Sequence, residues 1–326
     1  MRKFLLIIPL LILIALGGAF LWWKNTTSAP GEDSLTHRIV INRGAGAGQI
    51  ANKLETSGVI KNEFTFRVYL QVKGLTKSIP PGEFRIPGNI SVGQVVEILL
   101  AGPTELWVGI PEGLRREQYP EIFIESLEKT GEEARQFRVE FLAASAGQEG
   151  YLFPDTYLFP PDVDGSTAVV ALTANFDRRF DEAARASLAQ NTDFSVKQAV
   201  TLASIIERET RSVEERPTVA GIFINRLEIG MALQADATAQ YALGTPGNWW
   251  PKGLTRTDLQ INSPFNTYVI GGLPPAPIAN PGLTSLLAVV NPMSSDFFYY
   301  LHDPSGQIHY GRTLDEHNQN VAEYLR

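Results

Sequence analysis

An uncharged apolar run near the N-terminus constrains this chain more than any other sequence feature. The run extends from Phe4 to Trp23, follows Arg2 and Lys3, and ends in two tryptophans that Lys24 follows. About 20 apolar residues are needed to cross the hydrocarbon core of a bilayer as a helix, and tryptophan is typical of the interface between membrane and water. The run therefore predicts a membrane anchor with short flanks, residues 1–24.

A cleaved signal peptide is the alternative interpretation of this run. The run is long for the apolar region of a signal peptide, and no small-x-small cleavage site closes it. Basic residues that precede a span are retained in the cytoplasm. The anchor thus predicts a single-pass protein of the cytoplasmic (inner) membrane, with the rest of the chain on the external or periplasmic side.

Composition and charge exclude several classes of protein. The chain has 326 residues, of which 44% are hydrophobic and 19% charged, as in a globular protein with a sizeable core and more than one domain. Its formal net charge of −7 argues against nucleic acid as a partner, because phosphate backbones are held by clustered Lys and Arg. The sequence lacks cysteine, which excludes disulfides, thiolate nucleophiles and cysteine-rich zinc sites.

The order of predicted elements indicates an α+β fold. Residues 25–36 are polar and predict a flexible spacer. Residues 37–104 predict a small α+β module, with a strand at 38–44 and the helix N-cap Ser91. The spacing of apolar residues in this module predicts helices at residues 47–57, 63–72 and 91–102.

Residues 105–326 predict a larger, mixed α+β domain that opens with a short strand. Helices are expected at residues 116–129, 132–144, 166–188, 195–210 and 214–228. A Pro-Ser-Gly turn between 296–303 and 307–311 predicts a β-hairpin. The aromatic segment Glu149–Asp162 contains three prolines, which suit neither a helix nor a central strand, so it is either a packed loop or a wall that lines a substrate.

Two acidic residues, Glu207 and Glu209, interrupt the apolar helix predicted over Val196–Thr210. At 100° per residue, Glu207 falls inside the apolar arc and Glu209 at its margin, where a residue can line a cleft. A carboxyl group in apolar surroundings favours its neutral form, which a general acid requires. The alternative is that both are ordinary helix acids paired with nearby arginines. The helix plot does not distinguish these two interpretations, nor does it select one of the two acids.

Further polar side chains stand in apolar sequence downstream. Asn225, Gln234, Asp236 and Tyr241 are candidates for a carbohydrate groove, although such groups also cap helices and satisfy buried backbone. The Pro- and Gly-rich stretch Ser263–Gly282 predicts a functional loop of fixed shape.

Signatures of other chemistries are missing from the sequence. It has no nucleophile elbow, HExxH helix, P-loop or GxGxxG fingerprint. The histidines at 37, 302, 309 and 317 match no metal-ligand spacing. The sequence therefore predicts neither a metal nor a cofactor.

Four motifs, in order, resemble the endolytic membrane-bound lytic transglycosylases of bacterial cell-wall synthesis, the MltG or YceG-like family. They are TLASIIERET, FINRLEIGMALQADATAQYALG, SPFNTYVIGGLPPAPIANPG and a His-Asn pair in DEHNQNVAEYL. The resemblance covers nearly the whole chain, including the N-terminal span. It implies a LysM-like module in residues 37–104 and a catalytic domain in residues 105–326.

The same resemblance implies site residues. In the family, the second Glu of the E-x-E-T motif is the catalytic acid, which corresponds to Glu209. The implied groove residues are Asn225, Gln234, Asp236, Asn266 and Tyr268, with Tyr151 and Phe153 of the YLFPDTY stretch.

The implied reaction cleaves the bond between MurNAc and GlcNAc in peptidoglycan strands and leaves 1,6-anhydro-MurNAc ends, which would terminate nascent strands. Glu209 would protonate the glycosidic oxygen and then accept the proton of the C6 hydroxyl group that attacks the anomeric carbon. Glycan strands, the cytoplasmic membrane and penicillin-binding synthases are the implied partners.

Two other functions remain open from the sequence. One is a non-catalytic peptidoglycan-binding scaffold for division or elongation, against which the intact Glu209 argues. The other is a muramidase, in which water replaces the C6 hydroxyl group. The products distinguish the two enzymes, because hydrolysis adds a water molecule to them.

Overall fold

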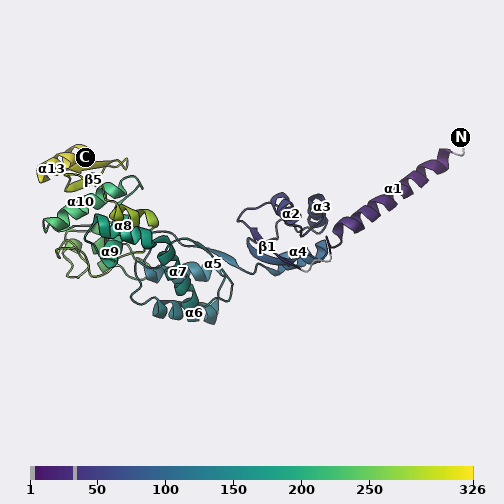
Figure 1. The fold of residues 1–326 in the computed structure, drawn as a ribbon, viewed down its shortest axis with the longest axis horizontal. Helices are drawn as coiled ribbons and strands as arrows, with labels where there is room; N and C mark the ends of the chain where they lie inside the picture. The colour runs from purple at the N-terminus through teal and green to yellow at the C-terminus, as the bar shows by residue number, and fades with distance from the viewer. Residues whose placement is uncertain (1–3, 32–34, 326) are drawn as a thin grey trace. The chain divides into compact units, whose positions relative to one another are not determined.

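The computed structural model describes residues 4–31 and 35–325, and within the first helix it describes the side chains from Leu11 onward. The chain divides into two compact units (Figure 1). Unit 1 comprises residues 1–108 and 157–162, and unit 2 comprises residues 109–156 and 163–326. Both units mix helices with two-stranded sheets, so the predicted α+β class is confirmed.

Helix α1 (Phe4–Thr27) covers the apolar run at the N-terminus. Among the described residues, no helix has the length and apolar character that a membrane span requires. The structure thus does not confirm the predicted anchor.

The spacer predicted for residues 25–36 is partly helical, because α1 continues to Thr27. The hydroxyl of Thr26 donates to the carbonyl of Trp22, and the hydroxyl of Thr65 in α3 (Glu63–Val72) donates to Thr26 at 3.0 Å. These contacts tie the end of α1 to α3. Residues 32–34 of the predicted spacer lie outside the described part of the chain.

The core of unit 1 is a small antiparallel sheet packed against helices. Strand β1 (Thr36–Ile41) pairs with β2 (Gly82–Pro87), and Ile39 lies opposite Phe84 in the register. Both of these side chains are fully buried, as are Leu54 of α2 (Ala47–Thr56) and Leu70 of α3. The third helix of this core is α4 (Val92–Ala101).

The predicted N-cap of α4 is confirmed. The Ser91 hydroxyl accepts from the backbone N–H of Gln94, and the Gln94 side chain accepts from the backbone N–H of Ser91. This reciprocal pair satisfies two of the free donors at a helix start.

Strands β3 (Leu106–Gly109) and β4 (Thr156–Phe159) form a second two-stranded sheet. Strand β4 belongs to the proline-containing segment Glu149–Asp162, in which Leu152 and Phe153 are buried. This segment therefore combines a packed loop with a short strand.

Unit 2 contains most of the helices of the chain, grouped around α9 (Val196–Glu209). The others are α5 (Tyr119–Ser126), α6 (Gly131–Ala144), α7 (Gly165–Arg179), α8 (Glu182–Asn191), α10 (Arg216–Glu228), α11 (Asp236–Leu243), α12 (Leu283–Val290) and α13 (Leu314–Tyr324). Short 3₁₀ turns lie at Arg116–Gln118 and Asp258–Gln260. Helices α10, α11 and α12 all contact α9, whose residues from Ala199 to Ile206 are all buried.

Two predictions for unit 2 meet different outcomes. The single helix predicted over residues 166–188 is wrong, because the chain breaks at Phe180 and the Asp181 side chain caps α8 by accepting from the Ala184 N–H. The predicted hairpin is confirmed as β5 (Tyr299–His302) paired with β6 (Ile308–Gly311). Gly306 supplies the positive φ angle of its turn, a conformation that favours glycine.

Candidate active site

Helix α9 carries both acidic residues of the E-x-E-T sequence at its C-terminal end. The helix starts at a capping box between Ser195 and Gln198 and ends where Thr210 turns to extended backbone. It is buried on all sides along its centre because three helices surround it. Its last turn presents Glu209 to a cavity.

Both carboxylate oxygens of Glu207 accept hydrogen bonds from the protein. One of its carboxylate oxygens accepts from the guanidinium of Arg216 at 2.8 Å, and the other accepts from the Gly282 N–H at 3.0 Å and the Ser285 hydroxyl at 2.8 Å. The side chain is only 6% exposed. Glu207 therefore ties α9 to α10 and to the start of α12, which is a structural role.

Glu209 faces a cavity of about 330 Å³ in unit 2. Its Oε1 atom accepts from the Ala237 N–H at the start of α11, and its Oε2 atom accepts from the Tyr300 hydroxyl of β5, both at 3.2 Å. Two donors hold the carboxyl group at the cavity wall, and neither of them is charged. This arrangement positions the group without forming an ion pair.

The surroundings of Glu209 favour its protonated form. Burial raises the pKa of Glu209 above its ordinary range, and the negative charge of Asp236 raises it further. The hydrogen bonds from Ala237 and Tyr300 and the charge of Arg208 act in the opposite direction, without cancelling the increase. A carboxyl group with a raised pKa can donate a proton near neutral pH and then serve as a base.

Asp236, Tyr268 and Arg226 form the polar wall around this acid. The Tyr268 hydroxyl donates to Asp236 at 2.6 Å, and burial together with Asp236 raises the pKa of Tyr268, which keeps it protonated. The guanidinium of Arg226 donates to the carbonyls of Phe298 at 2.6 Å and Leu233 at 2.7 Å. Arg226 therefore ties the hairpin to the segment before α11 while its charge stays beside the cavity.

The model of the YceG-like family matches residues 39–323. The chain belongs to the YceG-like family. A Bacillus subtilis (strain 168) relative named endolytic murein transglycosylase is 30% identical over 336 residues, which cover 96% of this chain and 91% of the relative. A Streptococcus pneumoniae (strain D39) protein of the same name is 26% identical over 353 residues, 97% of this chain and 64% of its own length.

A crystal structure of a yceG-like protein from Listeria monocytogenes is similar as well. It has 29% sequence identity to this chain and a TM-score of 0.57, and the match covers 88% of this chain and 99% of that one.

In this YceG-like protein, three of the predicted groove residues lie at the cavity: Gln234, Asp236 and Tyr268. The backbone of Gln234 has a φ angle of +49°, which is uncommon for a residue other than glycine. Its N–H donates to the carbonyl of Thr267, and the Thr267 hydroxyl accepts from the next N–H, that of Ala235. These two bonds hold the strained turn next to Glu209.

Two of the predicted groove residues, Asn225 and Asn266, instead donate hydrogen bonds from their side-chain amides to backbone carbonyls. The Asn225 side chain donates to the carbonyls of Ser295 and Phe297, at 2.8 and 2.9 Å. Asn266 is fully buried, donates to two carbonyls of the loop before it and accepts from the Tyr268 N–H. Both residues fix the loops that form the cavity and do not line it.

The predicted aromatic groove residues also lie away from this cavity. Phe153 is buried in the hydrophobic core of unit 2, and the ring of Tyr151 meets Phe176 edge-on with centroids 4.9 Å apart. Tyr241 packs against Phe265 at 4.8 Å. A role for these rings in glycan binding stays a prediction.

Sequence reasoning assigned no role to Arg226, Tyr299, Tyr300 or His317, which line the cavity. Side chains alternate between the two faces of a strand, so the hairpin strand predicted at 296–303 could have indicated that one of its two tyrosines faces inward. His317 was present in the quoted family motifs, but nothing in its sequence neighbourhood points to Glu209.

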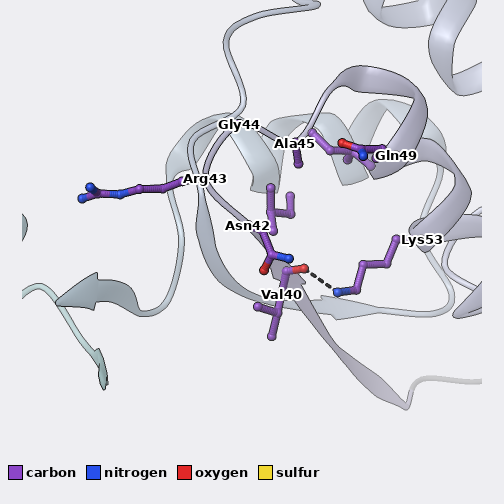
Figure 2. Close-up of a pocket in the computed structure, with 9 residues that line it drawn as sticks. Val40, Asn42, Arg43, Gly44, Ala45, Gln49 and Lys53 are labelled. Carbon is purple, nitrogen blue, oxygen red and sulfur yellow. Dashed lines mark hydrogen bonds between the residues drawn. The ribbon is translucent and has the colours of Figure 1, made fainter. Parts of the chain in front are cut away.

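A second cavity, of about 370 Å³, lies in unit 1 between the end of β1 and the start of α2 (Figure 2). Asn42, Gln49 and Lys53 line it, and none of its lining side chains is acidic. The ammonium of Lys53 donates to the carbonyl of Val40 at 2.7 Å, while Arg43 points away from the other labelled side chains (Figure 2). Without a carboxyl group, this cavity lacks the acid that glycosidic cleavage requires.

Residues 4–31 and 35–325 contain no group of three or more potential ligands that could hold a metal ion. His302 is paired with Glu215 at 2.9 Å, and His309 with Asp303 at 3.1 Å. Each of these histidines therefore has a single carboxylate partner.

Proposed function

We propose that this chain is an endolytic murein transglycosylase that cleaves the MurNAc–GlcNAc bond of glycan strands and leaves 1,6-anhydro-MurNAc ends. Relatives that match more than nine-tenths of the chain carry this name. The observation that carries the proposal is the setting of Glu209, a partly buried carboxyl group with a raised pKa at a cavity wall, held by uncharged donors.

One carboxyl group suffices for both proton transfers. Protonated Glu209 gives its proton to the glycosidic oxygen as the bond between this oxygen and the anomeric carbon breaks. The Glu209 carboxylate then takes the proton of the C6 hydroxyl group of the same muramic sugar, whose oxygen forms the new bond to the anomeric carbon. The enzyme returns to its starting state and no water is consumed, since the intramolecular attack replaces an external nucleophile.

The neighbours of Glu209 suit both steps. Burial and Asp236 favour the acid before the first transfer, while the Tyr300 hydroxyl and the Ala237 N–H stabilise the carboxylate between the two. Gln234, Asp236 and Tyr268 are the proposed sugar-binding groups of the cavity. Asn225 and Asn266 would act on the substrate only through the loops that they hold.

Digestion of purified peptidoglycan in ¹⁸O-labelled water tests the reaction. Transglycosylation gives anhydro-ended fragments without label, whereas a muramidase gives reducing ends that carry the label. The absence of any cleavage would favour the scaffold function.

We also propose that the protein is attached to the cytoplasmic membrane through the N-terminal segment. The support is its apolar sequence and the exposure of Leu13, Leu16, Phe20 and Leu21 on α1. Extraction of bacterial membranes with alkaline carbonate should leave the full chain in the membrane fraction and release a chain without residues 1–24. Release of both would contradict the attachment.

Unit 1 is proposed to be a LysM-like glycan-binding module. The support is the succession of β1, two helices and β2, together with the uncharged amides at its cavity. Replacement of both Asn42 and Gln49 by Ala should weaken co-sedimentation of the full chain with insoluble peptidoglycan, and unchanged co-sedimentation would argue against the module. Penicillin-binding synthases remain expected partners.

A further inference from the structure

We infer that His317 contacts the bound glycan, with the Nδ1 atom of its imidazole accepting a hydrogen bond from a hydroxyl group of the sugar that lies against Glu209. This inference rests on the proposed function and deepens it. It would add a substrate-binding residue from the C-terminal helix α13 to the polar groups that α9, α10, α11 and β5 place at the cavity.

The position of His317 is fixed by the packing of α13. The Thr313 side chain caps the helix by accepting from the Glu316 N–H at 3.1 Å, and the Asn320 amide donates to the carbonyl of Tyr310 on β6 at 3.0 Å. The ring of Tyr324 stacks on His309 with centroids 3.6 Å apart. Helix α13 is therefore anchored to the hairpin along its length.

The imidazole of His317 lines the same cavity as Glu209. Its ring lies nearly parallel to that of Tyr299 on β5, with an interplanar angle of 27° and centroids 5.3 Å apart. Stacking on Tyr299 orients the ring without using either nitrogen.

The Nδ1 atom of His317 is buried and has no hydrogen-bond partner in the described structure. Among the ionisable groups around it, Glu209 is paired with Tyr300, Asp236 with Tyr268, and Arg226 with two carbonyls. Buried polar atoms are nearly always hydrogen-bonded in folded proteins. In a side chain that lines a cavity, the missing partner is expected from the molecule that fills the cavity.

The electrostatic surroundings keep the imidazole uncharged. Burial lowers the pKa of His317, and the positive charge of Arg226 on α10 lowers it further. The other titratable groups at the cavity are Glu209, Asp236, Tyr268, Tyr299 and Tyr300. A neutral imidazole offers one acceptor and one donor, whereas an imidazolium offers donors only. The neutral form thus suits a ligand rich in hydroxyl groups.

The test measures the binding of soluble peptidoglycan glycan oligomers to the full chain by calorimetry, in a Glu209→Gln background that does not cleave them. His317→Ala should weaken binding about tenfold, the usual effect of losing one hydrogen bond. His317→Asn should restore much of the affinity, because its amide lies near the position of Nδ1, and His317→Gln should not. Gln319→Ala, an exposed position on α13, is the matched control.

A pH series separates a contact from a packing role. Protonation of His317 in acid should weaken binding by the Glu209→Gln parent, and this weakening should be absent from His317→Ala. Equal affinity of the parent and His317→Ala would overturn the inference while leaving the proposed function intact. Loss of binding in His317→Ala that His317→Asn does not restore would overturn the Nδ1 contact. Failure of the parent to bind any glycan oligomer would instead refute the proposed function.

Discussion

Glu149 is expected to make the stability of unit 2 strongly dependent on pH. Its carboxyl group accepts from the backbone N–H of Arg116 at 3.1 Å and from the Asn280 amide at 2.8 Å, and the Asn280 amide oxygen in turn accepts from the N–H groups of Gly150 and Leu152. Burial, with the nearby charge of Glu117, raises the pKa of Glu149 to about 8. The folded protein therefore holds a proton on Glu149 that the unfolded chain releases at neutral pH.

The direction and size of the effect follow from proton linkage. Because the folded pKa of about 8 lies above the ordinary value of 4.5, the stabilisation is complete below pH 4.5 and is lost as the pH rises through 8. Between pH 9 and pH 5 the group should add about 4 kcal/mol to the free energy of unfolding. Glu149→Gln removes the titration but keeps the shape, so its own unfolding free energy should lack this increase.

Urea unfolding at a series of pH values measures this difference. The free energy of unfolding of the wild-type protein minus that of Glu149→Gln should increase by about 4 kcal/mol as the pH falls from 9 to 5. Glu125→Gln, at an exposed position on α5, is the control and should follow the wild type. Parallel curves for wild type and Glu149→Gln would refute the reasoning, because they would mean that the buried carboxyl group stays ionised.

Three further predictions concern the two acids of α9. Arg216→Met should cost about 3–5 kcal/mol in the free energy of unfolding, since it leaves the buried Glu207 without its cation, and thermal denaturation measures this loss. Tyr300→Phe should move the alkaline limb of the pH–rate profile to higher pH, because it removes a donor that lowers the pKa of Glu209. Asp236→Asn should move the same limb to lower pH, because it removes a charge that raises this pKa; a limb unmoved by either change would contradict the assignment of Glu209 as the acid.

Features that depend on neighbouring residues were predictable from the sequence. The Ser91 cap, the hairpin turn and the helix that carries Glu209 all follow from residues within one or two turns of each other. The break between α7 and α8 was missed, although Asp181 is a typical N-cap residue, because the apolar period continues across it.

The distinction between Glu207 and Glu209 depends on distant residues. Glu207 is neutralised and bonded by Arg216 and Ser285, and Glu209 is positioned by Tyr300, more than 90 residues along the chain. Helical periodicity places Glu207 inside the apolar arc and Glu209 at its margin, and it carries no information about these partners. The family resemblance supplied the choice, and the geometry supplies its physical reason.

The amides of Asn225 and Asn266 illustrate a second limit. An amide presents the same donors to a sugar hydroxyl as to a backbone carbonyl, so a polar residue in apolar sequence fits either function. The structure pairs both side chains with carbonyls of loops that are distant or irregular, which no local pattern predicts.

The most direct test of the account compares the digestion of purified peptidoglycan by the wild-type chain and by Glu209→Gln, after thermal denaturation has established that both are folded. The account predicts 1,6-anhydro-ended fragments from the wild type and none from Glu209→Gln. Equal cleavage by the two proteins would contradict the assignment of Glu209 as the acid.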